Sequence, residues 1–109
     1  MKQMSPLSIN AHPPIDGCQV LAVAGEIDLA TSQQLRSAIE KALNRARFDR
    51  LVIDLEHVSF LDSTGIHTLM TARDWAAGRG VTLKVSKAHD MVKTVLAMTG
   101  VMPELVGDR

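Results

Sequence analysis

One stretch, from Leu51 to Met70, constrains the fold of this chain more than any other. It opens with the apolar run Leu51 to Ile53, which is typical of a strand buried on both faces. A polar loop follows, and from Ser63 onward the apolar residues recur at helical spacing. A strand, a short loop and a helix make half of a βαβ unit, whose working residues lie at the carboxyl end of the strand. We therefore expect the site of this protein at the start of that helix, around Ser63.

The length of the chain bears on the number of domains, and its net charge bears on the class of partner. The 109 residues suffice for one domain with a single core, so we predict one domain over residues 1–109 with its core at about 7–106. Twelve Lys and Arg balance twelve Asp and Glu, and this neutrality gives no electrostatic reason to expect a direct nucleic-acid partner or an anionic membrane.

The cysteine, the histidines and the apolar runs bear on disulfides, metal sites and membrane association. The one cysteine, Cys18, excludes an internal disulfide and a cysteine zinc site, and we expect it to be a small buried apolar residue. The histidines lack a metal-ligand spacing, so we expect no metal and no cofactor. No apolar run approaches the ~20 residues that cross a bilayer, and the N-terminus lacks the core of a signal peptide. We expect a cytoplasmic protein, a monomer or weak dimer without membrane association.

The strands are predicted from alternation and from turn residues. Alternating apolar residues predict an edge strand from Leu7 to Ala11, and the prolines with Asp16-Gly17 predict a hairpin turn to a second strand. The predicted strands are Leu7–Ala11, Cys18–Ala24, Leu51–Leu55 and Val81–Val85, and a final short strand over Val101–Val106 is left open.

The helices are predicted from helical spacing and from end signals. Thr31 and Gln34 have the spacing of a capping box, in which each side chain satisfies a free backbone donor at the helix start. The predicted helices are Thr31–Arg47, Ser63–Ala77 and a third that begins at Ser86 or Ala88 and ends before Gly100. The order β-β-α-β-α-β-α predicts a mixed, mostly parallel sheet packed with helices, a small α/β layer sandwich.

Two short motifs in this order resemble the STAS domain of bacterial anti-sigma factor antagonists. The first is the turn Gly25 to Asp28, and the second is the segment Val58 to Ile66, with a closing helix and turn at Val95 to Val101. The resemblance spans about Leu7 to Val106. It implies a single STAS-like domain that is not an enzyme, and the chain has neither the Gly-x-Ser-x-Gly elbow of a hydrolase nor a Gly-rich phosphate loop.

The resemblance also implies a switch. In that family the unphosphorylated antagonist binds an anti-sigma factor that is also a serine kinase, and so frees a sigma factor. The kinase inactivates the antagonist by phosphorylating the serine after the motif aspartate, here Ser63, and a metal-dependent phosphatase of the PP2C type removes the phosphate. The partner-binding residues implied are Asp28, Asp62, Ser63, Thr64 and Gly65, and we add His67, whose imidazole would change the size or charge of the same docking surface. The alternative is a constitutive STAS adaptor or scaffold subunit of a larger signalling or transport assembly.

The chemistry of these residues allows a second interpretation for each. Ser63 is predicted at or beside the helix N-cap, where free backbone N–H groups and the helix dipole suit a hydroxyl or a phosphate. It is therefore a phosphoacceptor, a simple cap, or both. Asp62 either contacts a partner or only places charge near the helix start, and Asp28 is either a contact or an ordinary turn residue. His67 stands where the family commonly has a glycine, at the spacing that lets its imidazole approach a Ser63 phosphate.

Overall fold

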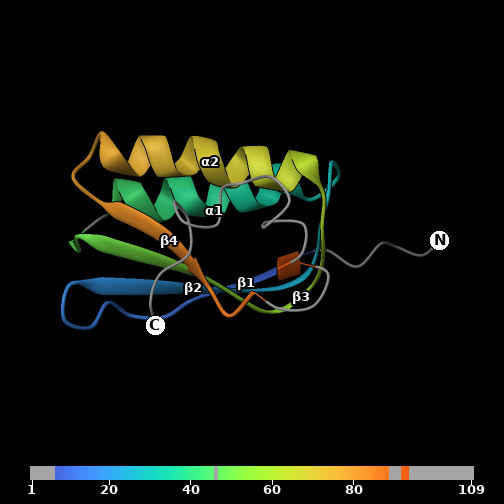
Figure 1. Ribbon diagram of the computed structural model, residues 1–109. Helices are drawn as coiled ribbons and strands as arrows, with labels where there is room; N and C mark the ends of the chain where they lie inside the picture. Colours follow the sequence, from blue (N-terminus) through green and yellow to red (C-terminus); the bar gives the residue numbers. More distant parts are fainter. Residues whose placement is uncertain (1–6, 46, 89–91, 94–109) are drawn as a thin grey trace.

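A mixed sheet with two helices packed on one of its faces forms the part of the chain that the computed structural model describes, residues 7–45, 47–88 and 92–93 (Figure 1). In chain order the elements are β1 (Ser8–Ala11), β2 (Cys18–Ile27), α1 (Ser32–Asn44), β3 (Arg50–Leu61), α2 (Ser63–Ala77) and β4 (Thr82–Ser86). The strands lie in the order β1-β2-β3-β4. The predicted α/β class is confirmed, as is the order of the elements as far as β4.

The chain begins with the predicted hairpin. β1 pairs antiparallel with β2, with Ile9 opposite Val23, and it forms one edge of the sheet. The turn is made by Asp16 and Gly17, whose φ angles are 53° and 77°. A two-residue turn with both φ angles positive matches the right-handed twist of the strands, and Asp-Gly is a preferred sequence for it.

The other pairs are parallel, as the βαβ order predicted, and they place β3 in the interior between β2 and β4. Leu51, Ile53 and Leu55 are fully buried, but Val52 and Asp54 between them are only half-buried. The prediction of a strand buried on both faces is therefore wrong. Both helices lie on the same side of the sheet (Figure 1), so one side of each strand packs against them and the other does not.

β3 is also longer than predicted. The polar segment after Leu55 continues as strand to Leu61, pairing with β2 up to the partners Ile27 and Leu61. The register between β2 and β3 shifts twice along the way, and such bulges disturb the period-two alternation from which a strand is recognised. As a result, β2 and β3 end side by side.

The two helices differ in how well their starts were predicted. α2 has the predicted bounds, whereas α1 begins at Ser32 and ends at Asn44. The predicted capping box is wrong, because the Thr31 side chain makes no cap bond and Gln34 Nε2 donates to the Leu7 carbonyl instead. No helix within residues 7–45, 47–88 and 92–93 is long and apolar enough to cross a membrane.

The core lies between the helices and the covered face of the sheet. Leu35 and Ile39 of α1 and Leu69 of α2 are fully buried, and Ile66 is 5% exposed. The predicted start of the third helix is wrong, because Ser86 is the last residue of β4 and Ala88 is not helical. Residues 92–93 are helical, and Val92 is buried. The remaining residues of that helix and the possible strand over 101–106 lie outside the described residues.

Candidate functional site

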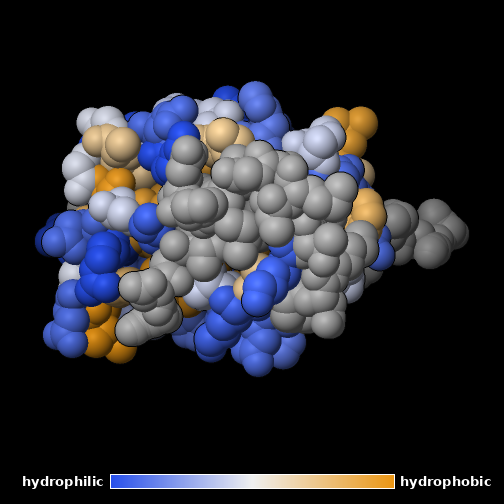
Figure 2. All heavy atoms as spheres, viewed as in Figure 1, coloured by the Kyte–Doolittle hydropathy of each residue, from blue (hydrophilic) through white to orange (hydrophobic). Residues whose placement is uncertain are grey.

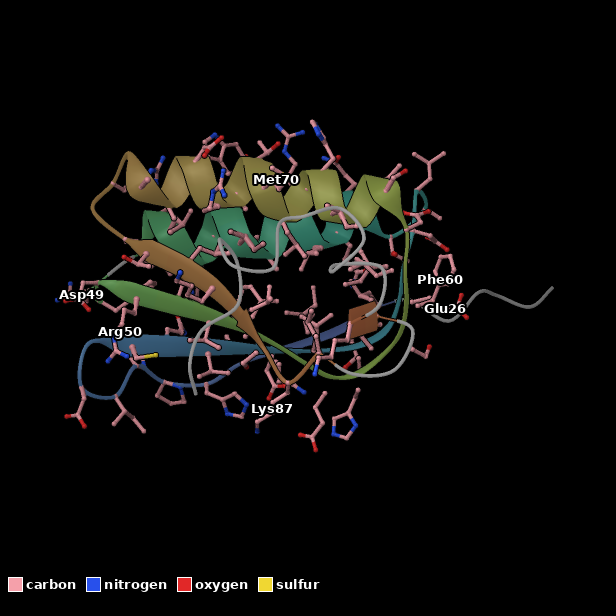
Figure 3. The ribbon with its side chains drawn as sticks, in the orientation of Figure 1. Glu26, Asp49, Arg50, Phe60, Met70 and Lys87 are labelled. Atoms are coloured by element: carbon pink, nitrogen blue, oxygen red, sulfur yellow. The ribbon has the colours of Figure 1, made fainter. Side chains whose placement is uncertain are left out.

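The ends of β2 and β3 and the first turn of α2 come together at one edge of the sheet. Ile27 and Leu61 are paired residues at the ends of β2 and β3, and the next residue of each chain segment is an aspartate. The backbone N–H of Asp62 donates to the Ile27 carbonyl oxygen at 3.2 Å. Asp28 and Asp62 therefore leave the sheet from neighbouring positions, beyond the labelled Glu26 and Phe60 (Figure 3).

Gly65 holds the first turn of α2 against the strand ends. A Cβ atom built on Gly65 would lie 2.5 Å from Leu61 Cδ1 and 2.6 Å from Ile27 Cγ2, far inside van der Waals contact. Both neighbours are buried core residues, so they have little room to move. The helix can approach this closely only because residue 65 has no side chain, and Gly65 itself is buried.

Asp62, rather than Ser63, is the N-cap of α2. Its Oδ1 accepts hydrogen bonds from the backbone N–H groups of Thr64 at 3.0 Å and Gly65 at 3.1 Å, and also from the Thr64 hydroxyl. Partial burial raises the pKa of Asp62, but the hydrogen bonds from the Thr64 hydroxyl and from backbone N–H groups lower it by more. The pKa of Asp62 consequently lies below its ordinary value of 3.8.

Ser63 is the first residue of α2, and its side chain is exposed. No hydrogen bond of the Ser63 hydroxyl is formed within the described part of the chain. The hydroxyl of Thr64, one residue on, is bound to Asp62, and Thr64 is half-buried. Of these two neighbouring hydroxyls, the one of Ser63 is on an exposed residue and the one of Thr64 is bound to Asp62.

The arrangement changes what a phosphate on Ser63 would meet. The sequence predicted free N–H groups at this helix start, but the Asp62 carboxylate already accepts from those of Thr64 and Gly65. A phosphate would therefore lie beside a carboxylate instead of on those backbone donors. The site is suited to carry negative charge on its surface, not to bury it.

Asp28 has a structural role at the start of α1. Its Oδ1 accepts from the Thr31 N–H at 3.1 Å, and its carbonyl oxygen accepts from the N–H groups of Thr31 and Ser32 at 3.2 and 2.8 Å. The Thr31 hydroxyl accepts from the Asp28 N–H at 2.9 Å and lies 2.7 Å from the Glu26 carbonyl, to which it donates. The turn interpretation of Asp28 thus has direct support, and the carboxylate is half-buried.

Leu29 was not singled out from the sequence. It is 75% exposed, one of two large apolar side chains so exposed among the described residues. Figure 2 shows apolar atoms on the surface at the end of the molecule where the β2–α1 turn lies. The available signal was an apolar residue between Asp28 and Thr31, inside a turn that gives it nothing to pack against. His67, also predicted for this site, is exposed on α2 one turn after Ser63.

Acidic and hydroxyl groups dominate this edge of the sheet. No cluster of three His, Cys, Asp or Glu side chains able to hold a metal ion occurs in residues 7–45, 47–88 and 92–93. What the site offers is an exposed hydroxyl, two flanking carboxylates and an exposed leucine, which are features of a protein-binding surface that modification can alter.

Comparison with known proteins gives one family and several relatives. The family model for the STAS domain matches residues 11–106. A STAS-domain-containing protein of Pseudomonas aeruginosa is 29% identical over 94 residues, covering 85% of this chain and 91% of that protein. The anti-sigma F factor antagonist of Paenibacillus polymyxa is 25% identical over 84 residues, covering 77% and 72%.

Solved structures show the same fold. An anti-sigma factor antagonist from Mycobacterium paratuberculosis is 27% identical with a TM-score of 0.80, covering 91% of this chain and 82% of that one. The antagonist SpoIIAA in its unphosphorylated form is 18% identical with a TM-score of 0.77, covering 94% of this chain and 89% of that one. SpoIIAA of Bacillus in its phosphorylated form is 17% identical with a TM-score of 0.69, covering 94% of this chain and 92% of that one. At these two lower identities the likeness concerns the fold alone.

Proposed function

Because the chain belongs to the STAS-domain family, we propose that it acts as an anti-sigma factor antagonist switched by phosphorylation at Ser63. In its unphosphorylated form it binds an anti-sigma factor that is also a serine kinase, and so releases a sigma factor to activate transcription. A phosphatase of the PP2C type restores the binding form. The protein works in the cytoplasm as a binding module, and it catalyses no reaction itself.

The observation that carries this proposal is the state of the Ser63 hydroxyl. A kinase must surround its acceptor serine, so the hydroxyl has to be exposed and free of internal hydrogen bonds. Ser63 is exposed at the first position of α2, whereas Thr64 donates to Asp62. Asp62 caps the helix without the Ser63 side chain, so we expect the cap to persist when Ser63 is modified.

Charge supplies the switch. A phosphoserine carries about −1.5 to −2 charges at neutral pH, and here it would stand next to Asp62 with Asp28 on the neighbouring strand end. Bringing such a group into an interface without a paired cation costs several kcal/mol, enough to weaken binding by ~10³. The phosphate therefore blocks the complex.

We define the docking surface as Asp28, Leu29, Asp62, Ser63 and His67, and call it the Ser63 face. The exposed leucine supplies an apolar anchor, since buried apolar contacts at the centre of an interface carry much of its binding energy. The two carboxylates select a partner with basic residues around an apolar socket. Thr64 and Gly65 hold this face in shape from beneath.

Modification should leave the fold standing. The Ser63 side chain is exposed and takes no part in the core. The chain also matches the fold of SpoIIAA in both its unphosphorylated and its phosphorylated form, which supports a switch that acts on binding and not on folding.

The test is to incubate the protein with its cognate anti-sigma kinase and ATP, then map the phosphate by mass spectrometry. We expect one phosphate on Ser63, none on the Ser63→Ala variant, and normal phosphorylation of a Thr64→Val control that is shown to be folded. The phosphorylated protein should lose the anti-sigma factor in a pull-down and regain it after treatment with the phosphatase. Phosphate on Thr64, or undiminished binding after phosphorylation, contradicts the proposal; absence of phosphate favours the constitutive adaptor.

A further inference from the structure

A second candidate site lies away from the Ser63 face, between the C-terminal half of α1 and the β1–β2 hairpin. It is an open groove of about 450 Å³, which falls in the size range of small-ligand pockets. Ile9 and Leu21 from the hairpin, Ala38 and Ala42 from α1, and Phe48 after α1 line it. We call it the hairpin groove.

The groove exists because small residues stand where α1 faces the hairpin. Ala38 and Ala42 are one helical turn apart on α1, and their short side chains leave space between this face of the helix and the hairpin. The opposite wall is the helix-facing side of the hairpin, where Ala11 is paired with Leu21. Ile9 and Phe48 are partly buried against the core, so the apolar floor of the groove is continuous with it.

The rim of the groove is positively charged. Lys41 is in the last turn of α1, Arg45 is its C-cap residue, Arg47 follows, and all three are exposed. No acidic side chain is among the described residues that line the groove, and none of these three cations forms an ion pair within that part of the chain. A cation in the last turn of a helix complements the helix dipole, but the dipole gives no reason for a rim of three cations beside an apolar hollow.

We propose that the hairpin groove binds a single-chain fatty acid, with its acyl chain along the apolar floor and its carboxylate at Lys41, Arg45 and Arg47. An apolar floor with cations at its rim complements a ligand with one anionic end and an apolar body. A polar ligand is disfavoured, because Gln19 is the one uncharged polar side chain among the described lining residues and it already donates to the His12 carbonyl at 2.8 Å.

The test uses dodecanoate below its micelle-forming concentration. Isothermal titration should give saturable binding, and NMR shifts should gather on Ile9, Ala38 and Ala42. Dodecyltrimethylammonium, with the same chain and the opposite charge, should bind at least ~10-fold more weakly. Absence of binding, or equal binding of the cationic amphiphile, overturns the proposal, as do shifts that gather on the Ser63 face.

Variants separate the rim from the floor. The double variant Lys41→Glu/Arg45→Glu should weaken dodecanoate binding by ~10-fold or more, and Arg79→Glu, an exposed cation outside the groove, should change it less than ~2-fold. Ala38→Phe should fill the groove and abolish binding, after its thermal unfolding has shown that it is folded. If it is not folded, the charge variants still decide the question, because unchanged binding by the double variant contradicts the proposed role of the rim.

Discussion

The two helices follow strands that end at paired residues, and they use the aspartate after the strand in different ways. β2 and β3 end at the paired residues Ile27 and Leu61, and each is followed by an aspartate. At α1 the aspartate belongs to a closed turn, in which Asp28 and Thr31 bind each other through backbone and side-chain groups. At α2 the aspartate is itself the cap, and the helix begins one residue later.

The difference decides which hydroxyl is available. The Thr31 hydroxyl is engaged with Asp28 and Glu26, and the Thr64 hydroxyl is bound to Asp62. Ser63, the residue after the capping aspartate, is exposed, and no described residue bonds its hydroxyl. An aspartate that caps a helix thus satisfies the backbone donors at the helix start and leaves the next hydroxyl exposed, as the proposed phosphorylation requires.

Charge at Ser63 should give the largest effect. The Ser63→Glu variant should bind the anti-sigma factor ~10³-fold more weakly, because the added carboxylate would be desolvated beside Asp62. Affinity is measured by titration calorimetry. The matched control is Thr82→Glu, an exposed position at the opposite end of the sheet, which should bind as the wild type does. Equal losses for both variants would mean that the effect is one of net charge and not of the Ser63 face.

The close contact under Gly65 should give the next largest effect. Gly65→Ala should lower the free energy of unfolding by ~1–3 kcal/mol, because its Cβ would press on buried Ile27 and Leu61. Gln34 occupies the same position of α1, is exposed, and donates to a loop carbonyl. Gln34→Ala should cost less, ~0.5–1 kcal/mol. Urea denaturation measures the unfolding free energy of both variants. A Gly65→Ala protein as stable as the wild type would contradict the close packing of Gly65 against Ile27 and Leu61.

The cap at Asp62 should have a smaller effect that depends on pH. Asp62→Ala should cost ~1 kcal/mol at neutral pH, and Asp62→Asn should cost less, because an amide oxygen can still cap. Since the pKa of Asp62 is lowered in the folded protein, its ionic contribution is complete above the ordinary value and is lost as the pH falls through the folded-state pKa.

The difference in unfolding free energy between wild type and Asp62→Asn should therefore shrink in acid, below about pH 4. Thermal unfolding across a pH series measures this difference. A difference that is independent of pH would show that the Asp62 carboxylate does not gain from its hydrogen bonds.

The smallest effect should come from removing the Ser63 hydroxyl. Ser63→Ala should change the unfolding free energy by no more than ~0.5 kcal/mol, because the side chain is exposed and Asp62 supplies the cap. The variant should keep binding the anti-sigma factor while resisting the kinase. A loss of ~1 kcal/mol in denaturation would instead show that Ser63 also caps the helix.

Most of the fold could be predicted from the sequence because its signals are local. The bounds of α2 follow from helical spacing with a glycine after its end, and the β1–β2 hairpin follows from Asp16-Gly17. The end of β3 could not be predicted, since polar residues such as Glu56 and His57 read as a loop where bulges break the alternation. Coverage of one sheet face is a tertiary property that the run Leu51 to Ile53 does not encode.

The helix start at the candidate site was predicted in position but not in detail. Ser63 and Asp62 are where the motif placed them, yet which of them caps α2 depends on backbone angles that the sequence does not reveal. The Thr31 hydroxyl makes no capping box, because it is bonded to the Asp28 N–H and the Glu26 carbonyl, which both lie before the helix. Leu29 was missed because its exposure depends on the path of the turn.

Gly65 also has an evolutionary consequence. Positions 63 and 65 are two residues apart, yet exposed position 63 can accept other side chains, whereas buried position 65 has no room for one. An exposed residue 63 can accept many substitutions that leave the fold intact, so the proposed switch could be lost by a single substitution. A lineage that replaced Gly65 would need smaller residues at both Ile27 and Leu61 at the same time. We therefore expect Gly65 to be retained among diverging relatives longer than the residue at position 63.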